Sequence, residues 1–225
     1  MTYFEILKKL KSSGSKKAIE GMARFGIRPK TKVYGVSMAD LRIMAKRIEK
    51  SHALALRLWN SGVHEAQILA SIVDKIEKVT EKQMEQWMKD FDSWDVCDQV
   101  CMNLFWRAPF SHRKATEWSG RKNEFEKRAG FALMAVLAWK DKNSSDAKFK
   151  KFFPLIKKES IDERNFVRKS VNWALRQIGK RNAKLKELAI KTAKEILKIN
   201  SKSARWIASD AIKELESAAV QKRLA

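Results

Sequence analysis

The stretch AGFALMAVLAW, residues 129–139, decides the fold because it is apolar on every side. A helix that is hydrophobic all round is buried in the core of a large protein or in a membrane. This run is shorter than the roughly 18 residues that a membrane-spanning helix needs. We therefore expect a central core helix, with other helices packed around it and no segment in a membrane.

Helical periodicity continues on both sides of this stretch, interrupted only by short breaks. The 8 Gly and 3 Pro of the 225 residues are too few for a sandwich or barrel built on many tight turns. Helices are predicted near 2–12, 15–25, 38–50, 52–60, 64–78, 81–90, 94–107, 111–119, 123–139, 145–157, 163–180, 183–199 and 201–222. Short connections without a linker predict one domain over residues 1–225, an all-α solenoid of stacked antiparallel helix pairs.

The charge balance indicates the class of partner. Lys and Arg number 48 against 26 Asp and Glu, a formal net charge of +22. A polyanion is the expected partner, with nucleic acid first. The N-terminal segment MTYFEILKKLKSSG lacks the apolar core and cleavage site of a signal peptide, so we expect a cytoplasmic protein.

Metal, redox and nucleotide chemistry have no motif in this sequence. Cys97 and Cys101 are four residues apart on one predicted helix, a poor geometry for a disulfide, and no histidine lies beside them. They are expected in the core. No phosphate-binding Gly-rich loop and no Ser/His/Asp set occurs. We expect no metal, no cofactor and no obligatory protein partner.

The segment SWDVCDQV, residues 93–100, places acids beside an indole in a strongly basic chain. Ser93 and Asp95 are explained by a helix start, as N-cap and first-turn acid. Trp94 and Asp98 are not, because a helical wheel places both on the shoulder of the apolar stripe. Asp98 is either an acid that faces a groove or a structural acid that pairs with an arginine or caps another helix.

A second segment, RNFVRKSVNWALRQIGK at residues 164–180, combines an indole with a row of cations. Trp173 points away from the core stripe, in line with Lys169, Arg176 and Lys180. Such an indole is a candidate stacking platform for a base or sugar. The alternative is a tryptophan packed against a neighbouring helix. Outside this segment, Arg128 opens the apolar helix, and its guanidinium is expected to point along the groove.

These segments resemble the bacterial DNA alkylation repair glycosylases built from HEAT-like helical repeats, the AlkD family. The resemblance runs from MARFG (22–26) through the final helices. It is strongest at SWDVCDQV, at EKRAGFAL (126–133) and at FVRKSVNWALRQIGKRN (166–182). The family's Trp-Asp-x-x-Asp, central Arg and Trp-x-x-Arg positions match Trp94 with Asp98, Arg128, and Trp173 with Arg176.

The resemblance implies a HEAT-like solenoid whose concave basic groove holds duplex DNA. It implies excision of cationic N3- and N7-alkylpurines without drawing the base into a pocket, unlike most glycosylases. Trp94 and Trp173 would contact the deoxyribose, and Asp98 would face the sugar as it becomes an oxocarbenium ion.

The DNA contacts implied by the resemblance are cationic and aromatic. Arg128 and Arg176 would lie near the lesion, and Lys169 and Lys180 would hold phosphates. Phe25 stands where the family often has a tyrosine, so a hydroxyl contact to the DNA backbone is missing there.

Two other functions remain open. One is a non-catalytic HEAT-like solenoid that binds branched or damaged nucleic acid, and the other is a scaffold for an acidic protein. Asp98 favours the glycosylase, because a pure binder of phosphates gains nothing from an acid in its groove.

Overall fold

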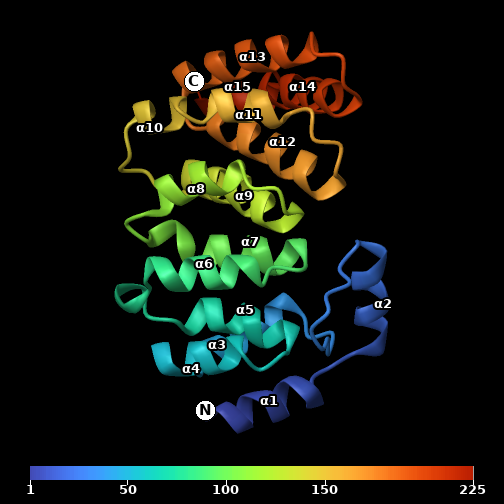
Figure 1. The fold of residues 1–225 in the computed structure, drawn as a ribbon, viewed down its shortest axis with the longest axis vertical. Coiled ribbons are helices and arrows are strands. Elements are labelled where there is room, and N and C mark those ends of the chain that lie inside the picture. Colours follow the sequence, from blue (N-terminus) through green and yellow to red (C-terminus); the bar gives the residue numbers. More distant parts are fainter. Residues whose placement is uncertain (225) are drawn as a thin grey trace. The chain divides into compact units, whose positions relative to one another are not determined.

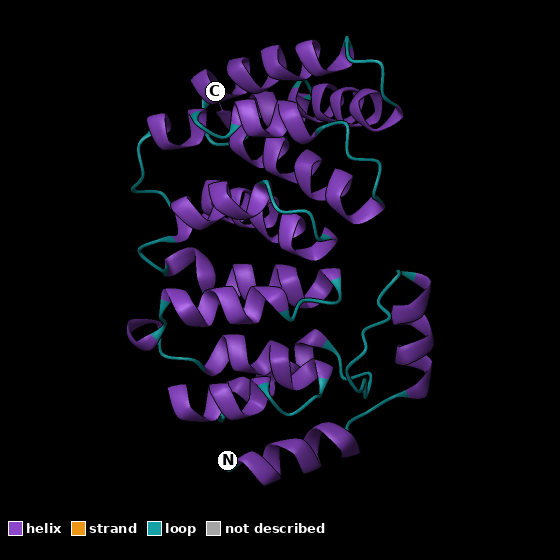
Figure 2. Cartoon of the chain, in the orientation of Figure 1, coloured by secondary structure: helices purple, strands orange, loops and turns teal. Residues whose placement is uncertain are grey.

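The structure is a computed structural model that describes residues 1–224. Its ordered elements are helices joined by loops (Figure 1), and in the described chain no strand accompanies the single bridge between Lys32 and Val63 (Figure 2). The predicted all-helical fold is confirmed. The chain divides into an N-terminal unit, Met1–Ala108, and a C-terminal unit, Pro109–Ala225. The single domain expected from the sequence stays a prediction.

The N-terminal unit is built around stacked aromatic rings. The indoles of Trp59 and Trp87 lie parallel, with centroids 4.0 Å apart, and Phe91 and Phe105 pack at their edges. Figure 1 shows α2 standing apart from the stacked helices of this unit, and none of its residues is buried. The elements are α1 (Tyr3–Ser12), α2 (Lys16–Arg24), α3 (Met38–Lys46), α4 (His52–Trp59), α5 (His64–Val73), η1 (Ile76–Lys78), α6 (Glu81–Lys89), α7 (Trp94–Asn103) and η2 (Phe105–Arg107).

The C-terminal unit is built around α9, which packs against α8 on one side and α12 on another. Its helices are α8 (Ser111–Ser119), α9 (Glu124–Lys140), α10 (Asp146–Lys150), α11 (Phe153–Glu159), α12 (Asn165–Gly179), α13 (Ala183–Leu197), α14 (Lys202–Leu215) and α15 (Ala218–Leu224). In α9 every residue from Arg128 to Ala138 is buried, but Trp139, the last residue of the apolar run, is 48% exposed because it lies at the end of the helix. No helix of the described chain is both long and apolar enough to cross a membrane.

Several predicted helices end earlier than the periodicity suggested, each for a local reason. The predicted helix 145–157 is two short helices, because Pro154 lies in the first turn of α11. The predicted helix 201–222 stops at Leu215, and the hydroxyl of Ser217 accepts the Val220 amide in the first turn of α15. The helix predicted over 94–107 ends at Asn103 and is followed by η2.

Close packing of α8 on α9 depends on Gly130. A Cβ atom at this position would lie 2.3 Å from the backbone nitrogen of Ser119, much closer than van der Waals contact. Glycine therefore lets the backbones of the two helices approach each other where α8 ends.

Gly130→Ala should destabilise the protein by roughly 1 to 3 kcal/mol, because the added methyl forces the two helix backbones apart. Urea unfolding measures the change. Gly21→Ala in α2 is the matched control, since its added methyl would meet no neighbouring atom within 4 Å. That change should stabilise by roughly 0.5 to 1 kcal/mol. Equal effects of the two substitutions would contradict the packing argument.

Candidate functional site

Trp94 and Phe25 are brought together by a hydrogen bond in the N-terminal unit. Trp94 is the first residue of α7 and is half-buried, and its Nε1 donates to the backbone carbonyl of Phe25 at 3.1 Å. Phe25 follows the last residue of α2, and its ring is 76% exposed. The carbonyl of Phe25 thus orients the indole, while its ring remains available at the surface.

The start of α7 is held by a different residue from the one predicted. Ser93 is the N-cap, but its hydroxyl makes no capping hydrogen bond. Asp95 instead contacts the buried His64 of α5, with Oδ2 2.8 Å from Nε2. Asp95, interpreted from the sequence as a first-turn acid, therefore also joins α7 to α5 through His64.

Electrostatics make this contact an ion pair. Burial alone would raise the pKa of Asp95, but the hydrogen bond and charge of His64 outweigh it, so this pKa is lowered. Burial alone would lower the pKa of His64, but Asp95, with the charges of Glu65 and Asp92, raises it above 6.5. Both groups are therefore charged together in the acidic to neutral range.

Glu65, next to His64, is a buried acid that sequence reasoning missed. It is 1% exposed, and its Oε1 accepts the backbone N–H groups of Tyr34, Gly35 and Val36 at 3.0, 2.6 and 3.2 Å. These bonds fix the loop that leads into α3. The sequence feature that could have indicated this buried acid is the polar pair His64-Glu65 at the start of the largely apolar segment HEAQILASIV.

Asp98 lies one turn after Trp94 on α7 and is 8% exposed. It is more enclosed than an acid on an open groove wall would be. A buried carboxylate agrees with the structural alternative, in which the acid serves the fold. It equally suits a catalytic acid, because a charge acts more strongly where water is excluded.

On α12 in the C-terminal unit, the predicted cationic row is largely neutralised. Arg176 and Lys180 both donate to Glu214 of α14, and Arg176 lies 3.4 Å from Asp210. Burial would raise the pKa of Glu214, but Lys180 and Arg176 lower it. Arg176 and Lys180, predicted as DNA contacts, therefore also hold α14 against α12, and their role in DNA binding stays a prediction.

Trp173 and Lys169 remain on the outer part of α12. Trp173 is half-buried, and in residues 1–224 its indole makes no hydrogen bond, ring stack or cation–π contact. Lys169 is exposed and likewise has no ion pair within that range. The roles predicted for them, a sugar contact by Trp173 and DNA binding by Lys169, stay predictions.

Arg128 has a structural contact that the sequence did not predict. It is 6% exposed, and its Nη1 donates to the carbonyl of Phe166 on α12 at 2.6 Å. The ring of Phe166 stacks on Phe125 of α9 with centroids 5.7 Å apart. Arg128 thus ties α9 to the start of α12, and its predicted contact near the lesion stays a prediction.

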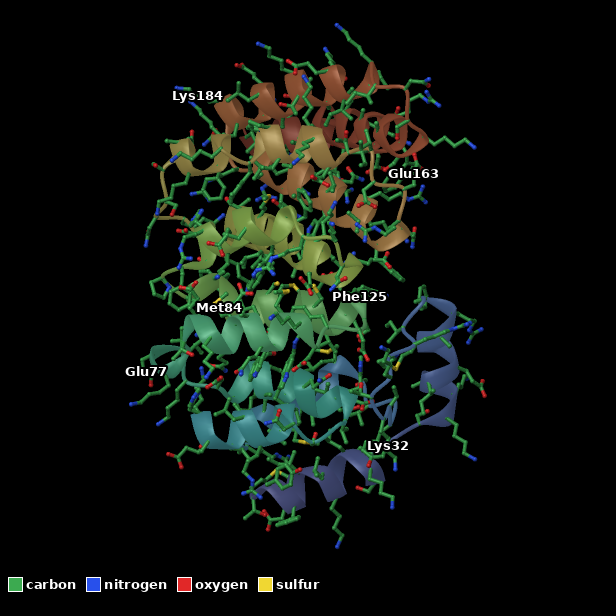
Figure 3. All side chains as sticks on the ribbon, in the orientation of Figure 1. Lys32, Glu77, Met84, Phe125, Glu163 and Lys184 are labelled. Atoms are coloured by element: carbon green, nitrogen blue, oxygen red, sulfur yellow. The ribbon has the colours of Figure 1, made fainter. Side chains whose placement is uncertain are left out.

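Exposed cations occur in both units. Lys32 of the N-terminal unit and Lys184 of the C-terminal unit project from the ribbon into solvent (Figure 3). Trp94, Phe25 and Asp98 belong to the first unit, and Trp173 and Lys169 to the second. Each unit thus contains an indole and charged groups of its own.

The fold is that of the HEAT-like repeat helical proteins. One solved structure covers 100% of this chain and 96% of its own with a TM-score of 0.81, at 19% sequence identity. It is described as a new family of proteins related to the HEAT-like repeat DNA glycosylases with affinity for branched DNA structures. No curated protein matches this chain.

The family model described as DNA alkylation repair enzyme matches residues 6–215. The chain therefore belongs to the DNA alkylation repair enzyme family. The resemblance inferred from SWDVCDQV and the segments around Arg128 and Trp173 is confirmed at the level of the family.

The pair between His64 and Asp95 predicts how stability depends on pH. The raised pKa of His64 gives stability below pH 6.5 that is lost as pH rises through the folded-state value. The lowered pKa of Asp95 gives stability above pH 3.8 that is lost as pH falls through its folded-state value. The pair should therefore contribute most between those two pH values.

His64→Gln should lower the free energy of unfolding most near pH 5.5 and less near pH 9. Histidine is charged at the lower pH and loses that charge as the pH rises, whereas glutamine is neutral at both. Urea unfolding of both proteins at the two pH values measures this difference. A loss that is the same at both values would show that the contact acts through packing alone.

Proposed function

We propose that this protein is an alkylpurine DNA glycosylase that excises cationic N3- and N7-alkylpurines from duplex DNA. The observation that carries the proposal is Asp98, a buried carboxylate one helical turn from the half-buried indole of Trp94 in a chain of net charge +22. Membership of the DNA alkylation repair enzyme family supports it.

The chemistry of the lesion explains why an acid is useful. A nucleobase that already carries a positive charge is a good leaving group, so little acid catalysis is needed. The enzyme must mainly stabilise positive charge as it develops on the sugar. A carboxylate and the faces of two indoles are suited to this, and we assign these roles to Asp98, Trp94 and Trp173.

Simple electrostatics gives the size of the effect. One unit charge at 4 Å contributes about 4 kcal/mol at an effective dielectric constant of 20. Each cation–π contact adds roughly 0.5 to 2 kcal/mol. One charge and two such contacts total about 5 to 8 kcal/mol, which corresponds to a rate increase on the order of 10⁴- to 10⁶-fold. The sugar cation can form without the base being drawn into a pocket.

DNA binding rests on the charge of the chain and on exposed groups. Lys169 and the ring of Phe25 are exposed and are proposed to contact the DNA backbone. Arg176 and Lys180 would contact phosphates only after their ion pairs with Glu214 are broken, so that a phosphate takes the place of the carboxylate. Arg128 is proposed to act close to the lesion through the position it gives α12.

A second candidate function is a non-catalytic protein that binds branched DNA. The solved structure described above favours it, since that protein is said to have affinity for branched DNA structures. The two functions differ in one measurable property, the release of a free base. Release of 7-methylguanine from methylated duplex DNA supports the glycosylase, and tight DNA binding without release supports the binder.

Asp98→Asn tests the catalytic assignment. Loss of about 4 kcal/mol of stabilisation should slow single-turnover excision by about 10³-fold. Affinity for undamaged duplex should stay equal or rise, because a negative charge is removed from a protein that binds phosphates. Glu77→Gln is the control, since Glu77 is an exposed acid of the same unit and its loss should not change excision.

Denaturant unfolding of the same Asp98→Asn protein distinguishes a catalytic Asp98 from a structural Asp98 that pairs with a cation. Breaking a buried ion pair costs about 3 to 5 kcal/mol. A variant that is destabilised by this amount, yet excises normally when folded, would make Asp98 a structural acid.

Trp173→Ala should lower excision with little loss of stability, since its indole is half-exposed. Trp118→Ala in the same unit is the contrast, because Trp118 is completely buried and its truncation should cost about 3 to 5 kcal/mol. Excision rates and melting temperatures of both variants show whether Trp173 is a site residue or a packing residue. Equal destabilisation would identify Trp173 as a packing residue.

A further inference from the structure

A cavity of about 270 Å³ lies within the N-terminal unit, between α2, the loop before α3, and helices α5 and α7. Its apolar wall includes Met22, Ile27, Met38 and Ile68, and Trp94 of the candidate site also lines it. Thioether and indole groups are polarisable and pack well against flat aromatic rings. The cavity therefore adjoins the candidate site and has walls suited to a planar ligand.

Helix α2 forms one wall of this cavity without being packed into the core. Its cavity-lining residues Ala18 and Met22 are only partly buried, as are all the inward residues of this helix. The helix is held at its ends, where Ser15 N–H donates to the Tyr34 carbonyl at 2.8 Å and the Phe25 carbonyl accepts the Trp94 indole N–H. The space under α2 is thus defined by fixed backbone contacts at both ends.

The opposite wall carries polar groups. His64 is completely buried and lines the cavity, and its Nε2 is bound to Asp95. Its Nδ1 has no hydrogen-bond partner among the described residues. A buried polar atom without a partner costs free energy, so the wall of the cavity at His64 contains an unsatisfied nitrogen. The side chains of Asp95 and Gln99 line the same wall.

Size and chemistry together limit the ligand. Pockets for drug-sized ligands usually hold about 300 to 1,000 Å³, so this cavity suits a single small heterocycle. Its apolar walls require a flat apolar body, and His64, Asp95 and Gln99 require hydrogen-bonding atoms along one edge. A purine base has both properties.

We propose that this cavity binds a free purine base and receives the base that excision releases. Only the source of the base rests on the proposed glycosylase function; the binding site itself follows from the cavity. Trp94 belongs to the candidate catalytic site and also lines the cavity. A base that leaves the sugar beside Trp94 is therefore released next to the cavity. The base enters the cavity after the glycosidic bond is broken, and the proposal needs no extrusion of an intact nucleotide.

Equilibrium dialysis of the protein with 7-methylguanine tests the site directly. Ala18→Phe fills the cavity from a partly exposed position and should weaken binding at least tenfold. Ala23→Phe is the matched control, because Ala23 is on the same helix but does not line the cavity. Circular dichroism and duplex affinity should be unchanged in both variants. Absence of saturable binding by the wild type, or equal binding by the Ala18→Phe protein, would overturn the proposal.

Inhibition by product tests the link to excision. Added 7-methylguanine should slow multiple-turnover excision by the wild type and by Ala23→Phe, and should have at least tenfold less effect on Ala18→Phe. Inhibition that is equal in all three proteins would overturn the role in product binding. If the base binds in the cavity but methylated DNA releases none, the purine site stands and the glycosylase function falls. If excision occurs without base binding, only the site falls.

Discussion

The burial of α9 is the constraint on which the C-terminal unit depends. A run of residues from Arg128 to Ala138 without exposed positions requires neighbouring helices along its length, and α8 and α12 meet that requirement. The core stripe of α12 then faces inward, with Val171 and Leu175 completely buried. Because Trp173 lies between these two core positions on a helix, it is turned toward the outside. The apolar helix thereby determines which face of α12 carries the indole.

A second constraint comes from buried and partly buried acids in a basic chain. Each has a partner that the fold supplies: Glu65 accepts backbone N–H groups, Asp95 binds His64, and Asp74 accepts from Gln83 at 2.7 Å and lies 2.8 Å from His52. These contacts join segments distant in sequence, so they position α5, α6 and the loop before α3. The same network fixes the start of α7, where Trp94 begins the helix that carries Asp98.

Much of the fold follows from the sequence, because local pattern determines helices. The apolar stretch 129–139, the short connections and the cap at Ser37, whose hydroxyl accepts the Asp40 amide at 3.1 Å, were sufficient for most helices. The segments around Trp94 and Trp173 also identified the family. Contacts between side chains far apart in the chain were not predictable. Nothing in the letters near Arg176 shows that Glu214 lies opposite it, since that depends on how α14 packs against α12.

The pairing on α12 changes what its surface offers to DNA. Arg176 and Lys180 pair with the acids Asp210 and Glu214, so that together with the exposed Lys169 this patch of five groups carries one net positive charge. Its attraction for phosphates is therefore weaker than a row of three free cations would give. The indole of Trp173 has no charge to lose, and its stacking or sugar contact is unaffected by these pairs. The side of α12 predicted as a general DNA-binding row is thus better suited to local contact with one nucleotide, while exposed lysines elsewhere, such as Lys32 and Lys184, supply the non-specific attraction.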